Sequence, residues 1–130
     1  LSKTNEYKSE IELKTNFRKF YNLTLTDKYL LENNIKFVKK KDIEEINKIH
    51  FGNRIFENYL TINKKLEKMS KKYQISFLSK QDFLCDKNKK TCDGITKDGY
   101  KIFYDYGHYT LRGAKYFGNK IHEINWFKIN

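Results

Sequence analysis

The sequence contains no proline, and its 130 residues include only three arginines, two cysteines, one methionine and one tryptophan. No run of apolar residues is long enough to cross a bilayer, and no signal-peptide pattern stands at the start. No glycine-, proline- or serine-rich stretch resembles a flexible linker, so residues 1–130 are expected to form a single domain. Because the sequence begins with Leu1 instead of Met, we expect it to be an excerpt from a longer protein.

Positive charge is abundant although arginine is scarce, and the formal net charge is +11 at pH 7. A basic surface of this kind is one signature of nucleic-acid binding. Arginine, however, is the residue that bidentate phosphate recognition prefers, and here nearly all the positive charge is lysine. The abundance of Lys, Asn and Ile indicates an AT-rich coding sequence, so we expect no nucleic-acid partner.

The two cysteines, Cys85 and Cys92, are separated by six residues. This spacing excludes a redox Cys-x-x-Cys motif, and a zinc ribbon would need further Cys or His ligands nearby. A short disulfide across a polar loop fits the spacing and would stabilise the fold by about 2–3 kcal/mol. Such a bond implies the periplasm or the cell exterior, whereas two free thiols in a cytosolic protein are the alternative.

Ten Tyr, ten Phe and the single Trp supply apolar volume for a core. Apolar residues recur at helical spacing in four stretches, 15–32, 42–49, 53–72 and 111–125. Two short β-prone runs, 35–38 and 75–78, are predicted to be strands. Helices and strands that alternate with short connections are typical of crossover units, so we predict an α/β domain with a parallel sheet flanked by helices.

Several single residues are assigned structural roles within these elements. Met69 belongs to the apolar stripe of the third predicted helix and is expected to pack in the core. Gly113 and Gly118 lower the helix propensity of the last helix, so they are expected to permit a close approach to a neighbouring element. His50 and His122 are interpreted as structural or surface residues. We expect no metal site and no cofactor.

Asp105 and His108 form the clearest candidate for chemistry. A carboxylate three residues before a histidine can accept a hydrogen bond from the imidazole Nδ1–H, which leaves Nε2 as a base. Thr110 is predicted to cap the helix that follows, because its hydroxyl can accept a hydrogen bond from a free N–H of the first turn. An Asp-x-x-His spacing also arises by chance, so a surface turn is the alternative interpretation.

The residues around this pair occur in a distinctive order: Phe83-Leu84-Cys85-Asp86, Thr91-Cys92, Asp98-Gly99-Tyr100 and Tyr104-Asp105-Tyr106-Gly107-His108-Tyr109-Thr110-Leu111-Arg112-Gly113-Ala114. This series resembles the C-terminal end of SGNH/GDSL-type hydrolase domains, above all those fused to integral-membrane acyltransferases that modify bacterial surface polysaccharides. The resemblance covers roughly residues 75–127. Tyr109 departs from it, since the family often has Leu at that position.

The resemblance implies a three-layer, flavodoxin-like α/β fold and a Ser-His-Asp triad to which His108 and Asp105 would contribute. It implies an acyl-ester substrate, foremost the O-acetyl esters of a surface glycan, and no cofactor. It also implies a periplasmic or extracellular domain of a bacterial inner-membrane protein. The partner within that protein would be an upstream membrane acyltransferase domain.

The same resemblance calls for a nucleophilic serine in a Gly-Asp-Ser turn and for oxyanion donors in a Gly-x-Asn-Asp block. None of the five serines follows an Asp, and Gly52-Asn53 is not such a block. We therefore expect residues 1–130 to be the C-terminal portion of the domain, inactive alone, with the nucleophile upstream. Two alternatives remain: a degenerate domain that binds without catalysis, and a basic extracellular module stapled by one disulfide.

Overall fold

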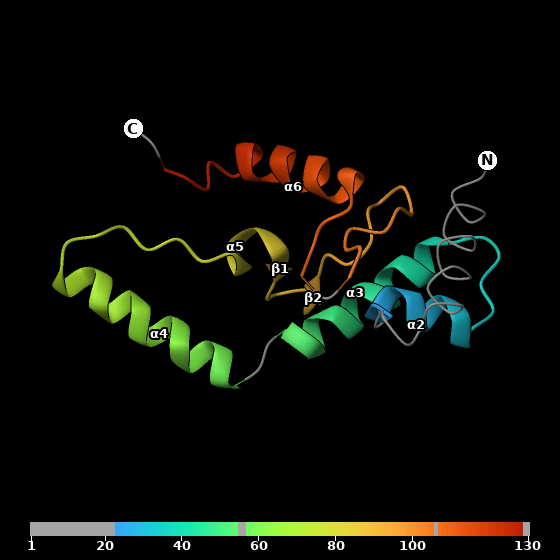
Figure 1. The fold of residues 1–130 in the computed structure, drawn as a ribbon, viewed down its shortest axis with the longest axis horizontal. Helices are drawn as coiled ribbons and strands as arrows, with labels where there is room; N and C mark the ends of the chain where they lie inside the picture. The colour runs from blue at the N-terminus through green and yellow to red at the C-terminus, as the bar shows by residue number, and fades with distance from the viewer. Residues whose placement is uncertain (1–22, 55–56, 106, 129–130) are drawn as a thin grey trace.

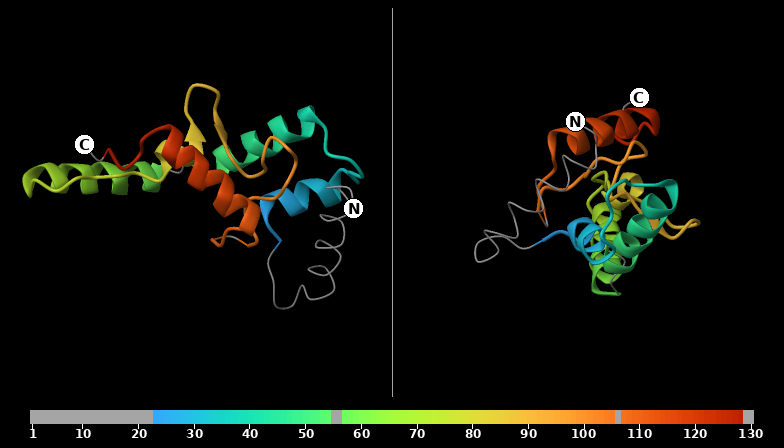
Figure 2. Two further views of the ribbon diagram at one scale, coloured as in Figure 1. Left: turned by 90° about the horizontal axis from the view of Figure 1, so that it is seen from above. Right: turned by 90° about the vertical axis from the view of Figure 1, so that its right-hand side faces the viewer.

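The computed structural model describes residues 23–54, 57–105 and 107–128 (Figure 1). Its elements, in chain order, are α2 (Leu25–Glu32), α3 (Lys40–Arg54), α4 (Glu57–Lys72), α5 (Gln81–Leu84), β1 (Cys85–Asp86), β2 (Thr91–Cys92) and α6 (Leu111–Glu123). The molecule is elongated, with α2 and α3 side by side at one end and α4 extending toward the other (Figures 1 and 2). The β1–β2 hairpin, α5 and α6 occupy the middle.

The helix α2 begins with a reciprocal cap that the sequence encodes. The Thr24 hydroxyl accepts a hydrogen bond from the Asp27 N–H at 3.1 Å, and the Asp27 carboxylate accepts one from the Thr24 N–H at 3.0 Å. Beyond the cap, Leu30 of α2 packs with Ile46 of α3 and with Ile95, and these three side chains form the first core cluster. The predicted helix 15–32 is therefore present from Leu25 onward, and residues 15–22 lie outside the described part of the chain.

The two cysteines lie opposite each other in the β1–β2 hairpin and form a disulfide. The predicted disulfide is therefore confirmed. The hairpin is held to α6 from one side, because Asp93 accepts hydrogen bonds from the Tyr116 hydroxyl at 3.2 Å and from Lys120 Nζ at 2.5 Å. On another side, β2 packs against α3.

The second core cluster joins α5, α6 and the segment between the hairpin and α6. Its buried members are Phe83, Leu84, Ile102, Phe103 and Phe117. The rings of Phe83 and Phe117 meet edge to face, with centroids 5.5 Å apart. After α6 the chain is tied to this cluster by Trp126, whose indole N–H donates to the Ser79 carbonyl at 3.0 Å. Trp126 therefore anchors the C-terminal segment to this cluster.

The two glycines of α6 differ in their surroundings. A Cβ on Gly113 would collide with the backbone carbonyl of Ile102, so the helix approaches the preceding segment at a distance that only glycine allows. Nothing lies within 4 Å of a Cβ placed on Gly118. The prediction of a close approach is confirmed at Gly113 and wrong at Gly118.

The predicted parallel sheet is absent from the described residues. The runs 35–38 and 75–78 are both without strand structure, and the only sheet in this part of the chain is the two-stranded antiparallel β1–β2. A strand needs a partner for its backbone groups, and residues 75–78 instead run extended beside α4 (Figure 1). A three-layer arrangement therefore does not form here, although the α/β composition expected of the family is compatible with the described elements.

The exposure of α4 differs from a second prediction. Met69 was expected to pack in the core with the apolar stripe of this helix, yet Ile62, Leu66 and Met69 are 56%, 46% and 53% exposed. The helix extends from the body in both views, so only part of its surface meets the chain that returns toward α5 (Figure 2). One helix was predicted over residues 53–72, but residues 53–54 end α3 and α4 begins at Glu57.

Candidate functional site

The candidate site lies on a closed loop immediately before α6. The Tyr104 N–H donates to the His108 carbonyl at 2.8 Å, and Phe103 and Tyr109 form an antiparallel bridge beside this bond. One residue further, the Thr110 N–H donates to the Ile102 carbonyl at 2.8 Å. The loop is therefore closed at its base by this bridge and the two hydrogen bonds that form it, and its tip carries Asp105 and His108.

Within the loop, Asp105 holds both the backbone and the side chain of His108. Its Oδ1 accepts hydrogen bonds from the N–H groups of Gly107 at 2.9 Å and of His108 at 2.8 Å. The imidazole Nδ1 lies 2.8 Å from Oδ2 and 2.9 Å from Oδ1. The hydrogen bond from Gly107, together with the imidazole, lowers the pKa of Asp105 to about 2.

This arrangement determines which imidazole nitrogen carries the proton. Asp105 is ionised near neutral pH and can only accept hydrogen bonds, so the neutral ring of His108 places its proton on Nδ1. The Nε2 lone pair is then available. The His108 side chain is 77% exposed, and no hydrogen bond joins it to a serine hydroxyl within residues 23–54, 57–105 and 107–128.

A cavity opens beside the loop that carries His108. Its volume is about 480 Å³, and Gly107 and Tyr109, the two neighbours of His108 in sequence, both line it. Residues of α4 and residues 77–81 also line it, whereas His108 itself is not among the lining residues. The volume falls in the range of small-molecule sites, so a space that could admit a substrate group lies next to the His108 loop.

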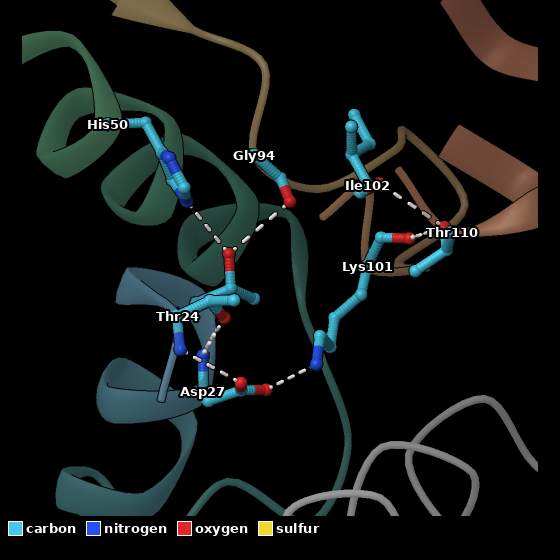
Figure 3. Close-up of polar contacts among 8 residues, drawn as sticks. Thr24, Asp27, His50, Gly94, Lys101, Ile102 and Thr110 are labelled. Carbon is cyan, nitrogen blue, oxygen red and sulfur yellow. Dashed lines mark hydrogen bonds and ion pairs between the residues drawn. The ribbon is translucent and has the colours of Figure 1, made fainter. Parts of the chain in front are cut away.

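Thr110 connects this loop to the helix that follows. Its hydroxyl accepts a hydrogen bond from the Gly113 N–H at 2.9 Å, which confirms the predicted cap. The same hydroxyl donates to the Lys101 carbonyl at 2.6 Å (Figure 3). The start of α6 and the segment that enters the loop are therefore held by one side chain.

A buried polar network around Thr26 and His50 contacts Gly94, which lies in the segment between the hairpin and the His108 loop (Figure 3). The Thr26 hydroxyl lies 2.9 Å from His50 Nε2 and 3.3 Å from the Gly94 carbonyl. Burial, with a smaller contribution from the positive charge of Arg54, lowers the pKa of His50 to about 4. The interpretation of His50 as structural agrees with this placement, since only 3% of the residue is exposed.

No pattern in the sequence indicated which residues line the cavity. Asn63, Ser79 and Gln81 come from α4 and from the chain that follows it, and none belongs to a recognisable motif. Their convergence depends on how α4 is placed, which no local pattern encodes. In the described part of the chain, no three His, Cys, Asp or Glu side chains converge as metal ligands.

The comparison with known families identifies the chain. The family described as "SGNH domain (fused to AT3 domains)" matches residues 37–123, more than half of the sequence, and the chain belongs to this family. The resemblance to this family that the C-terminal motifs indicated is thereby confirmed, and the match also covers the upstream helices α3 and α4. The domain is accordingly of the acyltransferase or esterase type. No curated protein and no solved structure matches the chain.

The description of the family states that such SGNH domains are fused to AT3 domains, and this supports a membrane acyltransferase part in the same protein. Among the helices of residues 23–54, 57–105 and 107–128, none combines the length and apolar character that a membrane span requires.

Proposed function

We propose that the parent protein transfers or removes O-acyl groups, foremost O-acetyl groups, on cell-surface glycans, and that this chain supplies the Asp105–His108 half of its catalytic triad. The observation that carries the proposal is the hydrogen bond between His108 Nδ1 and the Asp105 carboxylate, on a His108 side chain that is 77% exposed. The family match supports the reaction class. The chain would be the C-terminal portion of a longer domain.

In this proposal the nucleophile is a serine hydroxyl supplied by another part of the parent protein. His108 Nε2 would accept the hydroxyl proton as the serine oxygen attacks the acyl carbonyl, and would return it to the leaving alcohol. Asp105 would stabilise the imidazolium and hold the ring in its productive tautomer. Water or a glycan hydroxyl would then take the acyl group from the serine by the same proton transfers in reverse.

The proposed location is the periplasm or the cell exterior. The Cys85–Cys92 disulfide supports it, because such bonds persist in oxidising compartments. The fusion of the family to AT3 domains supports a site next to the membrane, where the acceptor would be a surface polysaccharide.

The deciding experiment compares acetyl-ester hydrolysis by the full-length parent and by two histidine variants. His108→Ala should lower kcat by a factor of about 10⁴, because the general base is lost. His122→Ala is the matched control, since His122 is an exposed residue on α6 away from the loop. Equal rates for both variants and the wild type would refute the role of His108 and favour a non-catalytic basic module.

The variant Asp105→Asn tests whether Asp105 positions the ring of His108, while the ring itself remains available as a base. The asparagine amide can donate to Nδ1 and would favour the tautomer that carries its proton on Nε2. Its kcat should fall by a factor comparable to that of His108→Ala, and the nitrogen chemical shifts of the His108 ring should report the changed tautomer. A wild-type tautomer in this variant would contradict the proposed role of Asp105.

A further inference from the structure

The cavity next to the His108 loop has a polar, cationic and aromatic lining. Asn63 and Gln81 supply amides, Arg54 and Lys80 supply positive charge, and Phe77 and Tyr109 supply aromatic surface. Hydroxyl-rich ligands with one apolar face fit this combination, since amides and cationic groups bind their oxygens and a ring covers their C–H groups. A pyranose that bears an acyl ester has these properties.

Tyr109 is the aromatic residue closest in sequence to His108. Its ring lies with its centroid 5.3 Å from that of Phe103 and 5.3 Å from that of Phe117, so the core holds it in place. The residue is nevertheless 39% exposed, and it lines the cavity. It therefore presents a supported ring at the point where the cavity meets the His108 loop.

Gln81 supplies an independent indication that a ligand belongs here. The residue is only 9% exposed, and its amide nitrogen has no hydrogen-bond partner in the described part of the chain. A buried donor without an acceptor is costly, and the terminal torsion of a glutamine is broad enough to turn the amide toward the cavity. An oxygen atom of a bound sugar would provide the missing acceptor.

We propose that this cavity is a glycan subsite, in which the ring of Tyr109 stacks on a pyranose while Gln81 and Asn63 bind its oxygens. The inference rests on the proposed function, because it would place the acyl ester of a bound sugar next to the loop that carries His108. Tyr109 would then be a specificity-determining residue. The replacement of the more usual Leu by Tyr at this position would select a sugar ring over a simple alkyl ester.

The test is a two-dimensional NMR titration of the 130-residue chain with methyl 6-O-acetyl-glucopyranoside. Methyl glucopyranoside and sodium acetate serve as comparison ligands. The backbone signals of Gly107 and Tyr109 and the side-chain amide signals of Asn63 and Gln81 should shift together and saturate. The acetylated sugar should bind more tightly than the unmodified sugar, and acetate alone should leave these signals unchanged.

Substitutions test whether the aromatic ring of Tyr109 contributes to sugar binding. Tyr109→Leu should weaken binding by about five- to tenfold, whereas Tyr109→Phe should stay within about twofold of the wild type, because the ring and its packing remain. Tyr104→Leu is the matched control, since Tyr104 lies on the same loop, is 45% exposed and is not part of the cavity wall. Asn63→Ala, a change on α4 outside the core, should weaken binding about threefold even if Tyr109→Leu disturbs folding.

Three results would overturn the subsite: signals that never saturate, shifts confined to exposed lysines, or equal effects of Tyr109→Leu and Tyr104→Leu. Shifts produced equally by sodium acetate would point to an anion contact and would also overturn it. The titration involves no turnover. A negative result therefore leaves the hydrolysis test of His108 standing, and inactivity of His108→Ala does not by itself establish the subsite.

Discussion

Lys101 Nζ lies 2.7 Å from Asp27 Oδ1, and both side chains are at most 1% exposed. The other carboxylate oxygen of Asp27 accepts the Thr24 N–H at the start of α2, and the Lys101 carbonyl accepts the hydroxyl of Thr110 (Figure 3). The ion pair therefore joins the first helix of the described chain to the segment that carries the candidate site.

Removal of the lysine charge should destabilise the fold strongly. Lys101→Met leaves the Asp27 carboxylate buried without its cation, and the free energy of unfolding should fall by about 3–5 kcal/mol. Urea unfolding followed by circular dichroism measures the change. The control is Lys97→Met, since Lys97 is an exposed lysine on the same segment. Lys101→Met combined with Asp27→Asn should recover part of the loss, and a loss equal to that of the control would contradict the buried pair.

The two glycines of α6 offer a matched pair of helix substitutions. Gly113→Ala should destabilise by about 1–3 kcal/mol or more, because the new methyl group would overlap the Ile102 carbonyl. Gly118→Ala should instead stabilise by up to about 1 kcal/mol, because its Cβ meets open space and alanine favours helix. Thermal unfolding of both variants gives the comparison. Shifts of the same sign would mean that α6 does not approach Ile102 as described.

The sequence was sufficient for the local chemistry of the site. The hydrogen bond between Asp105 and His108 and the one from the Gly113 N–H to the Thr110 hydroxyl each span three residues, so both depend on short-range geometry that spacing can predict. The cavity wall was not predictable in this way. Asn63 and Tyr109 are far apart in the sequence, and their approach depends on where α4 leaves the body of the molecule.

The fold was predictable only in part for a related reason. Helix periodicity identified most of α3, α4 and α6, because each helix satisfies its own backbone hydrogen bonds. The β-prone runs 35–38 and 75–78 contain the right residue types, but a strand exists only with a partner beside it. Composition carries no information on that partner, and the predicted parallel sheet is accordingly absent from the part of the chain that the structure describes.

The disulfide should contribute measurably to stability. Cys85 and Cys92 close a loop of eight residues, for which loss of chain entropy in the unfolded state corresponds to about 2.5 kcal/mol. The Cys85→Ser, Cys92→Ser double variant should lose about this amount in urea unfolding. Dithiothreitol should lower the stability of the wild type by a similar amount and leave the double variant unchanged. An effect of the reductant on both proteins would point to something other than this bond.

The buried imidazole of His50 makes stability depend on pH. Its pKa is about 4 in the folded chain and about 6.5 when the chain is unfolded, so between these values only the unfolded state binds the proton. The stabilising contribution is therefore complete above about pH 6.5 and is lost as the pH falls toward 4. The full loss amounts to about 3 kcal/mol. The physical reason is burial, because His50 is only 3% exposed and its ring lies against Thr26 and Gly94, which leaves the protonated form poorly solvated.

Urea unfolding at pH 7 and at pH 4.5 measures this dependence. His50→Gln removes the titrating group but keeps a polar side chain near Thr26. The variant should be less stable than the wild type at pH 7, because the fit beside Gly94 is altered, and it should lose much less stability on acidification. The wild type should lose about 2 kcal/mol more than the variant between the two pH values. Parallel losses in the two proteins would contradict the lowered pKa of His50.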